Sequence, residues 1–201
     1  MVKIAEVMLG TSFYKLGVYP RHLNGLVGII TSPLIHANFK HLIANSSSFL
    51  VLSTALFFFY RKLAFRIFIL NYLMSGIFLW LGGRELWHIG ASGIIYGMAA
   101  FLLFSGIFKQ DLRLLTISLI VIFLYGGLFW GLFPIEPRIS WEGHLMGTFS
   151  GIILSLLFYK KGPRRKSFEW ENETDEEEED QTDDENQENA EYPFFDDSND
   201  Q

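Results

Sequence analysis

A serine among small residues is the first candidate for chemistry in this sequence. Ser92 stands in the segment Gly90-Ala91-Ser92-Gly93. Small neighbours leave room for a substrate carbonyl at the hydroxyl, as they do at the exposed nucleophile of many hydrolases. Serine and glycine are also common packing residues in membrane helices, so this segment alone leaves both interpretations open.

A histidine followed by two glycines is the second candidate. His144 precedes Gly147 and Gly151 at a spacing that places all three on one face of a helix. A neutral imidazole can take a proton from a serine hydroxyl near pH 7 and return it to a leaving amine. A similar stripe of small residues begins at Gly93, so two helices could approach closely and bring His144 toward Ser92. The alternative is a histidine at the membrane interface beside a helix-packing motif.

The third candidate is a polar group formed by His36, His41 and Asn45. His41 and Asn45 are four residues apart and therefore face the same way on a helix. Both can donate hydrogen bonds, and donors aimed at the oxygen of a tetrahedral intermediate are usually the largest single contribution to catalysis. A histidine metal site and a helix-capping cluster are the alternatives. A zinc site would need a further ligand, and the chain has no cysteine to supply one.

The base has no obvious acidic partner. The uncharged stretches that carry these candidates contain no Asp or Glu to orient His144. A Ser–His dyad is therefore the more economical hypothesis than a Ser–His–Asp triad. Tyr96 lies one helical turn after Ser92, where its ring could stack on the imidazole and hold it.

The elements that must position these residues are apolar helices. Five stretches contain no Asp, Glu, Lys or Arg: residues 41–60, 67–83, 86–108, 114–135 and 143–159. Each is close to the roughly 17–25 residues that a membrane-spanning helix needs. Backbone groups in lipid must be satisfied within the chain, so each stretch is predicted to be a helix. We therefore expect an all-α, polytopic membrane bundle with five clear spanning helices.

The charges are distributed unevenly along the chain. Residues 1–166 hold all 16 Lys and Arg but five acids, whereas residues 167–201 hold the other 17 of the 22 acids. The bases cluster between the first and second stretches, between the third and fourth, and after the fifth, which predicts that this side is cytoplasmic. His41, Ser92 and His144 then lie near the outer ends of their helices. The acidic tail, poor in apolar residues, is expected to be disordered and solvated.

Taken in order, these motifs resemble the signatures of rhomboid intramembrane serine proteases of the basic bacterial type. The matching segments are His36-x4-His41-x3-Asn45, Gly90-Ala91-Ser92-Gly93 with Tyr96, and His144-x2-Gly147-x3-Gly151. They correspond to the family's second, fourth and sixth helices. The resemblance covers roughly residues 20–160.

The resemblance implies hydrolysis of peptide bonds in or near transmembrane helices of other proteins. Ser92 would attack, and His144 would act as base and then as acid. His41, Asn45 and the Ser92 backbone N–H would form the oxyanion hole. The implied supporting residues are Tyr96, His36, Gly90, Gly93, Gly147 and Gly151. The implied partners are transmembrane substrates and the lipid bilayer, without cofactor, metal or nucleic acid, in a bacterial plasma membrane with the site facing outward.

The sequence departs from this family pattern at its beginning. Basic rhomboids have six membrane helices, and the missing one here is the first, so we expect it to be absent or truncated. Residues 26–29 read Leu-Val-Gly-Ile where the family's first outer loop usually carries a Trp-Arg pair. The expected organisation is an N-terminal stub and outer interfacial loop (1–40), a membrane domain (41–160) and a basic, then acidic, tail (161–201).

Two other classes of protein compete with an active protease. One is a catalytically silent relative that binds membrane clients, although such relatives usually lose the serine or the histidine that this chain keeps. The other is a small transporter or channel, which needs a continuous polar path. The polar candidates here gather at one depth, and the inner halves of the predicted helices are almost wholly apolar.

Overall fold

The computed structural model describes residues 2–124, 130–135 and 140–162. The chain divides into two units, Met1–Arg164 and Arg165–Gln201. The second unit, with nearly all of the predicted acidic tail, lies outside the described residues.

Five long helices form in the predicted apolar stretches. They are α3 (Phe39–Phe59), α4 (Ala64–Gly82), α5 (Ser92–Lys109), α6 (Leu112–Leu124) and α8 (Trp141–Leu157). The described residues contain no strand beyond one isolated bridge between Val18 and His88, so the all-α prediction is confirmed. Three helices, α3, α4 and α5, are long and apolar enough to cross a membrane. Because α6 and α8 are shorter and part of the stretch 114–135 lies outside the description, the count of five spans stays a prediction.

Ser92 lies at the end of its helix, as predicted. The uncharged stretch 86–108 begins before that helix, because α5 begins only at Ser92. Gly90 has a φ of +110°, a conformation that is readily adopted only by glycine and that does not continue into a helix. The turn at Gly90 therefore places Ser92 at the N-terminal end of α5.

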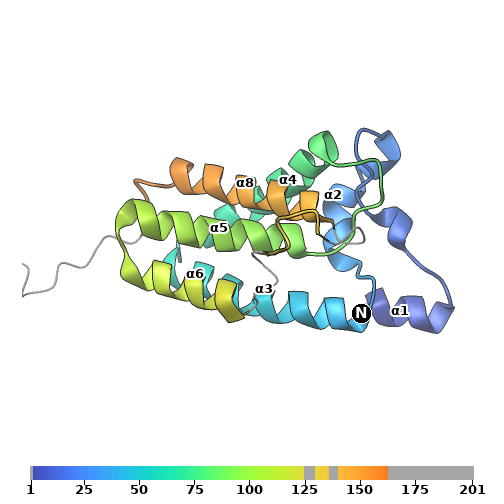
Figure 1. Cartoon of the computed structure of the whole chain (residues 1–201), viewed down its shortest axis with the longest axis horizontal. Coiled ribbons are helices and arrows are strands. Elements are labelled where there is room, and N and C mark those ends of the chain that lie inside the picture. Colours follow the sequence, from blue (N-terminus) through green and yellow to red (C-terminus); the bar gives the residue numbers. More distant parts are fainter. Residues whose placement is uncertain (1, 125–129, 136–139, 163–201) are drawn as a thin grey trace, which may run out of the picture. The chain divides into compact units, whose positions relative to one another are not determined.

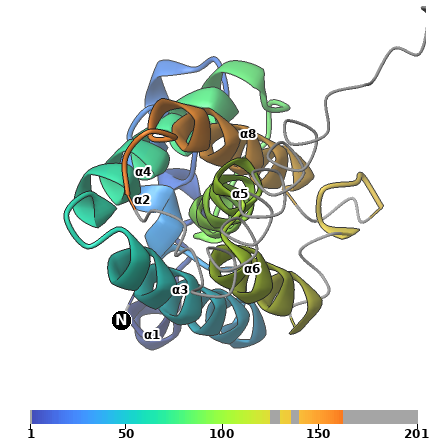
Figure 2. The same ribbon diagram turned by 90° about the vertical axis from the view of Figure 1, so that its left-hand side faces the viewer.

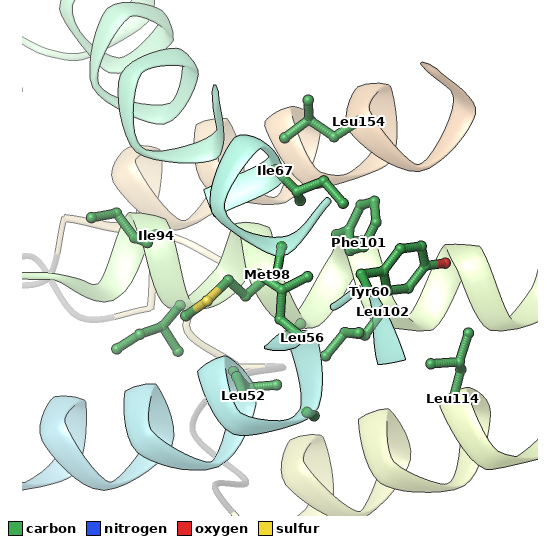
Figure 3. Close-up of a cluster of buried hydrophobic side chains, with 14 of the residues drawn as sticks. Leu52, Leu56, Tyr60, Ile67, Ile94, Met98, Phe101, Leu102, Leu114 and Leu154 are labelled. Atoms are coloured by element: carbon green, nitrogen blue, oxygen red, sulfur yellow. The ribbon is translucent and has the colours of Figure 1, made fainter. Parts of the chain in front are cut away.

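Helix α5 is the central element of the bundle. Figure 2 shows it surrounded by α3, α4, α6 and α8, and its most extensive contacts are with α8. In Figure 1, α8 lies along one side of α5 while α3 and α6 lie along the other. Its side chains, including Met98, Phe101 and Leu102, join Leu56 of α3 and Leu154 of α8 in a continuous apolar core (Figure 3). The site residues on α5 are thus carried by the most buried helix.

Short helices occupy the chain before α3. They are α1 (Val2–Leu9), η1 (Tyr14–Leu16), η2 (Leu23–Gly25), α2 (Gly28–Thr31) and η3 (Ser32–Leu34). The last three form one apolar segment, Leu23–Leu34, which is shorter than a spanning helix. Several of its apolar side chains are exposed, including Leu23, Val27 and Ile30. The interfacial role predicted for this region remains a prediction.

Candidate active site

Helices α5 and α8 approach each other through glycines beside the two candidate catalytic residues. A Cβ added to Gly147 would lie 2.0 Å from the carbonyl oxygen of Gly93, and one added to Gly93 would lie 3.1 Å from that of Gly143. Neither helix could come this close with a larger residue at Gly147. Gly93 follows Ser92 directly and Gly143 precedes His144 directly, so the close contact brings the two residues' backbones together.

The imidazole of His144 is held on two sides. Its ring stacks on Tyr96, with 4.2 Å between the ring centroids and 5° between the planes. Its Nδ1 lies 2.8 Å from the carbonyl oxygen of Gly131. A carbonyl only accepts hydrogen bonds, so Nδ1 carries the proton and Nε2 keeps its lone pair. The buried ring therefore presents a proton acceptor at Nε2, and a backbone carbonyl takes the place of a triad's acid.

Ser92 is half-buried in the first turn of α5 and lines a small cavity. The cavity is also lined by Gly90, Gly93, His88 and Gly143. Within the described part of the chain, no hydrogen bond joins Ser92 to His144. Hydrogen bonds between catalytic groups are often long in the absence of substrate and tighten when substrate binds. Ser92 and Tyr96 are one turn apart on α5, so the ring stacked on Tyr96 lies on the Ser92 side of that helix.

His41 and Asn45 lie against the loop that leads into Ser92. Asn45 Nδ2 donates to Nε2 of His36 at 3.0 Å and to Nε2 of His41 at 3.2 Å. A Cβ on Gly90 would meet the His41 ring at 2.9 Å and Asn45 Nδ2 at 3.5 Å, so only glycine fits there. His36, His41 and Asn45 thus form one hydrogen-bonded group. This group contacts Gly90, which lies two residues before the candidate nucleophile Ser92. Burial, and then the charge of His41, lower the pKa of His36, which favours its neutral ring.

The candidate metal site has too few ligands in the described residues. Across these parts of the chain, no group of three or more His, Cys, Asp or Glu side chains could hold a metal ion. His36 and His41 are instead edge to face, with 5.1 Å between their ring centroids, and share the Asn45 amide.

A polar cluster near Ser92 was missed by the sequence analysis. His88 Nδ1 lies 2.6 Å from Ser140 Oγ, and His88 Nε2 lies 3.0 Å from the carbonyl oxygen of Arg84. The Arg84 guanidinium donates to both carboxylate oxygens of Glu142. Glu142 is an acid two residues before His144 on α8, but its partner is Arg84 rather than His144. The partners in the His88–Ser140 bond and in the Arg84–Glu142 ion pair lie more than 50 residues apart in the chain, so no local sequence pattern marks these pairs.

A second missed group lies deeper in the bundle. Asn71 of α4 donates to the carbonyl oxygen of Ile94 at 2.9 Å and accepts from Ser150 of α8 at 3.1 Å. Both side chains are buried, and their hydrogen bonds connect α4, α5 and α8. A signal for Asn71 was available, because an amide inside an apolar span must find a partner there.

Comparison with known proteins links the chain to a single family. The family model described as "Rhomboid domain" matches residues 23–161. An uncharacterized protein of Mycobacterium tuberculosis is 34% identical over 184 residues, which cover 83% of this chain and 72% of the relative. The protein named "Putative rhomboid protease YdcA" of Bacillus subtilis is 34% identical over 142 residues, or 68% of this chain and 69% of the relative. No solved structure matches the chain significantly.

Proposed function

The chain belongs to the rhomboid family of integral membrane proteins, and from this premise we propose that it is an intramembrane serine endopeptidase. Its substrates would be transmembrane segments of other proteins, cleaved by a dyad of Ser92 and His144. The observation that carries this proposal is the arrangement of His144. Its ring is stacked on Tyr96, its Nδ1 proton is bound to Gly131, and its Nε2 is left as a base on the Ser92 side of α5.

The proposed reaction begins with proton transfer from Ser92 Oγ to His144 Nε2 as Oγ attacks the scissile carbonyl carbon. The resulting tetrahedral intermediate carries its negative charge on the former carbonyl oxygen. Collapse breaks the C–N bond, and the imidazolium returns its proton to the leaving amine. Water, deprotonated by His144, then attacks the acyl carbon. The C–Oγ bond breaks as this second intermediate collapses, and His144 returns the proton to Ser92 Oγ.

Stabilisation of the oxyanion is assigned to the group beside Gly90. His41, Asn45 and the Ser92 backbone N–H are the proposed donors. The contact of His41 and Asn45 with Gly90, two residues before Ser92, supports this assignment. Because both hydrogens of the Asn45 amide bond to histidines in the absence of substrate, the proposal requires Asn45, and the N–H of His41, to turn to the oxyanion when substrate binds. Ser92 is the first residue of α5, so its N–H belongs to the helix end whose amides have no partner within the helix.

The substrate class follows from where such a site can act. Carbonyls within a helix are engaged in hydrogen bonds, so a substrate helix must unwind locally to offer one to Ser92. We therefore propose cleavage near small or helix-weakening residues. The proposed location is a bacterial plasma membrane, with the site toward the outer face and the C-terminal tail in the cytoplasm, as the distribution of Lys and Arg favours.

The test is cleavage of a transmembrane substrate by the full chain reconstituted in liposomes. Ser92→Ala and His144→Ala should each abolish cleavage while the protein stays folded, and a fluorophosphonate probe should label the wild type but not Ser92→Ala. Ser53→Ala is a matched control, because this exposed hydroxyl on α3 bonds only to its own helix, at Leu50. Cleavage that persists in Ser92→Ala would disprove the proposal.

A catalytically silent, client-binding relative is the second candidate. The absence of a Ser92–His144 hydrogen bond among the described residues is the observation that favours it. A folded wild type that neither cleaves substrate nor reacts with the probe, yet retains a transmembrane client, would establish this alternative.

A further inference from the structure

His88 and Ser140 lie in equivalent positions relative to the proposed dyad. His88 is four residues before Ser92, and Ser140 is four residues before His144. The two side chains are joined by the 2.6 Å hydrogen bond between His88 Nδ1 and Ser140 Oγ. This bond therefore connects the segment that enters α5 to the segment that enters α8, and both residues line the cavity beside Ser92.

The direction of this hydrogen bond follows from the other nitrogen of His88. Nε2 lies 3.0 Å from the Arg84 carbonyl oxygen, which can only accept, so Nε2 carries the proton. Burial lowers the pKa of His88, which favours a neutral ring whose Nδ1 accepts from the Ser140 hydroxyl. The charged groups that face His88 are Arg84 from its own loop and Glu142 from α8, and these two are paired with each other.

The Ser140 hydroxyl does not cap its own helix. It is the N-cap residue of α8, where a serine side chain ordinarily accepts from a backbone N–H of its own helix. Here it makes no such bond. The hydroxyl is directed across to His88 instead, so the arrangement is not explained by the local stability of α8.

The backbone of His88 is also held in place. Its N–H donates to the Val18 carbonyl at 2.8 Å and its carbonyl accepts from the Val18 N–H at 2.9 Å, so the His88 backbone is fixed against the N-terminal region. The glycine contacts set the spacing of α5 and α8 from Gly93 inward. They leave the two entering segments to be fixed by other groups. Among the described residues, the His88–Ser140 bond and the Arg84–Glu142 ion pair connect these segments, and Arg84 also lies over the Trp141 ring.

We propose that His88 and Ser140 are a positioning pair for the reaction: their hydrogen bond holds the start of α5 against the start of α8 and so aligns Ser92 with His144. This inference rests on the proposed function. Neither residue touches the reacting atoms in this role. Loss of the bond should lower the rate of the chemical step and leave substrate binding nearly unchanged.

The kinetic test compares Ser140→Thr with Ser140→Val, which have the same shape but differ in the hydroxyl. With active protein counted by fluorophosphonate titration, Ser140→Val should lower kcat about three- to tenfold, the worth of one ordinary hydrogen bond, with KM nearly unchanged. Ser140→Thr should retain most of the rate. Ser155→Ala is the matched control, because it removes a hydroxyl that bonds within α8, to Ile152. Equal kcat values for the Thr and Val variants would overturn the proposal.

A second measurement does not depend on activity. The chain has no cysteine, so spin labels can be attached to Leu86→Cys and Leu145→Cys, which are 52% and 41% exposed on the two sides of the link. The distance distribution should be narrow in the wild type and in Ser140→Thr, and broader in Ser140→Val. An unchanged distribution in Ser140→Val would reject the link even if the wild type proved inactive. Absent cleavage with a broadened distribution would instead reject the proposed function and keep the link.

Discussion

At the scale of single residues, the arrangement of His144 explains how a base can be oriented without an acid. A buried carboxylate beside the imidazole would have to be desolvated, which is expensive in a membrane protein. The Gly131 carbonyl performs the same orienting task without a charge, since it fixes the proton on Nδ1. A carbonyl lacks the negative charge that would stabilise the imidazolium, so the proposed reaction would rely more heavily on precise placement of the groups.

The stack of Tyr96 on His144 leads to a prediction about placement. Tyr96→Leu removes the aromatic face that lies 4.2 Å from the imidazole, whereas Tyr96→Phe keeps it. Aromatic pairs contribute about 0.5–1.5 kcal/mol beyond their buried area. We expect kcat for cleavage in liposomes to be about two- to tenfold lower in the Leu variant than in the Phe variant. Similar rates for the two variants would show that the stack does not hold the base during catalysis.

The Asn45 amide leads to a prediction about the oxyanion. Asn45→Ala removes a proposed donor, and loss of one oxyanion-hole donor typically lowers kcat about 100- to 1,000-fold. KM should change far less, because the charge develops only in the transition state. Asn24→Ala, at an exposed amide outside the cluster, is the control and should leave kcat unchanged. A wild-type kcat in Asn45→Ala would exclude this amide from the oxyanion hole.

Residue types and spacing were sufficient to find the groups on helices. The intervals from Ser92 to Tyr96 and from His144 to Gly147 are helical, so faces could be assigned without knowledge of the fold. The partners supplied by loops could not be found in this way. Gly131 contacts His144 through its carbonyl and Ser140 contacts His88 through its hydroxyl. Both residues precede α8 in segments whose course depends on the packing of the whole bundle.

At the scale of elements, the glycine stripes are where the sequence pattern and the packing agree most closely. Gly151 would place a Cβ 2.1 Å from the carbonyl oxygen of Gly97, one turn along from the Gly147–Gly93 contact. The absence of charge alone did not locate the start of α5, because uncharged residues 86–91 are compatible with both helix and loop. The motif around Ser92, which was expected near a helix end, marks the start correctly. The positive φ of Gly90 shows that the chain before Ser92 is not helical. This φ could not be predicted from the sequence, because glycine adopts positive and negative φ about equally readily.

These stripes lead to a prediction about stability. Gly147→Ala would drive a methyl group into the Gly93 backbone at 2.0 Å, and α5 and α8 would have to separate. We expect the free energy of unfolding to fall by about 2 kcal/mol or more, the upper range for overpacking, and activity to fall with it. The measurement is unfolding in mixed detergent micelles. In the control Gly82→Ala, the methyl group meets only the end of the Met146 side chain, at 3.1 Å, and stability should change little.

At the scale of the whole molecule, charge and apolar length together define how the chain sits in a bilayer. Helices α3, α4 and α5 are long and apolar enough to cross a membrane, and their connecting loops differ in charge. Arg61 and Lys62 follow α3, whereas the loop after α4 contains a single base and a single acid, Arg84 and Glu85. This difference is a property of the sequence alone. It predicts an outward-facing site, because Ser92 and His41 lie at the ends of α5 and α3 away from the basic loop.

The orientation can be tested because the chain has no cysteine of its own. Leu86→Cys, in the loop after α4, should react with a membrane-impermeant maleimide on intact bacterial cells. Lys62→Cys, in the exposed basic loop after α3, should react only after the cells are permeabilised. The two loops lie at opposite ends of α4, a helix of 19 residues that spans about 28 Å, so they cannot share one face of the membrane if α4 crosses it. Labelling of Lys62→Cys alone on intact cells would place the proposed site on the cytoplasmic side and restrict its substrates to peptide bonds near that face.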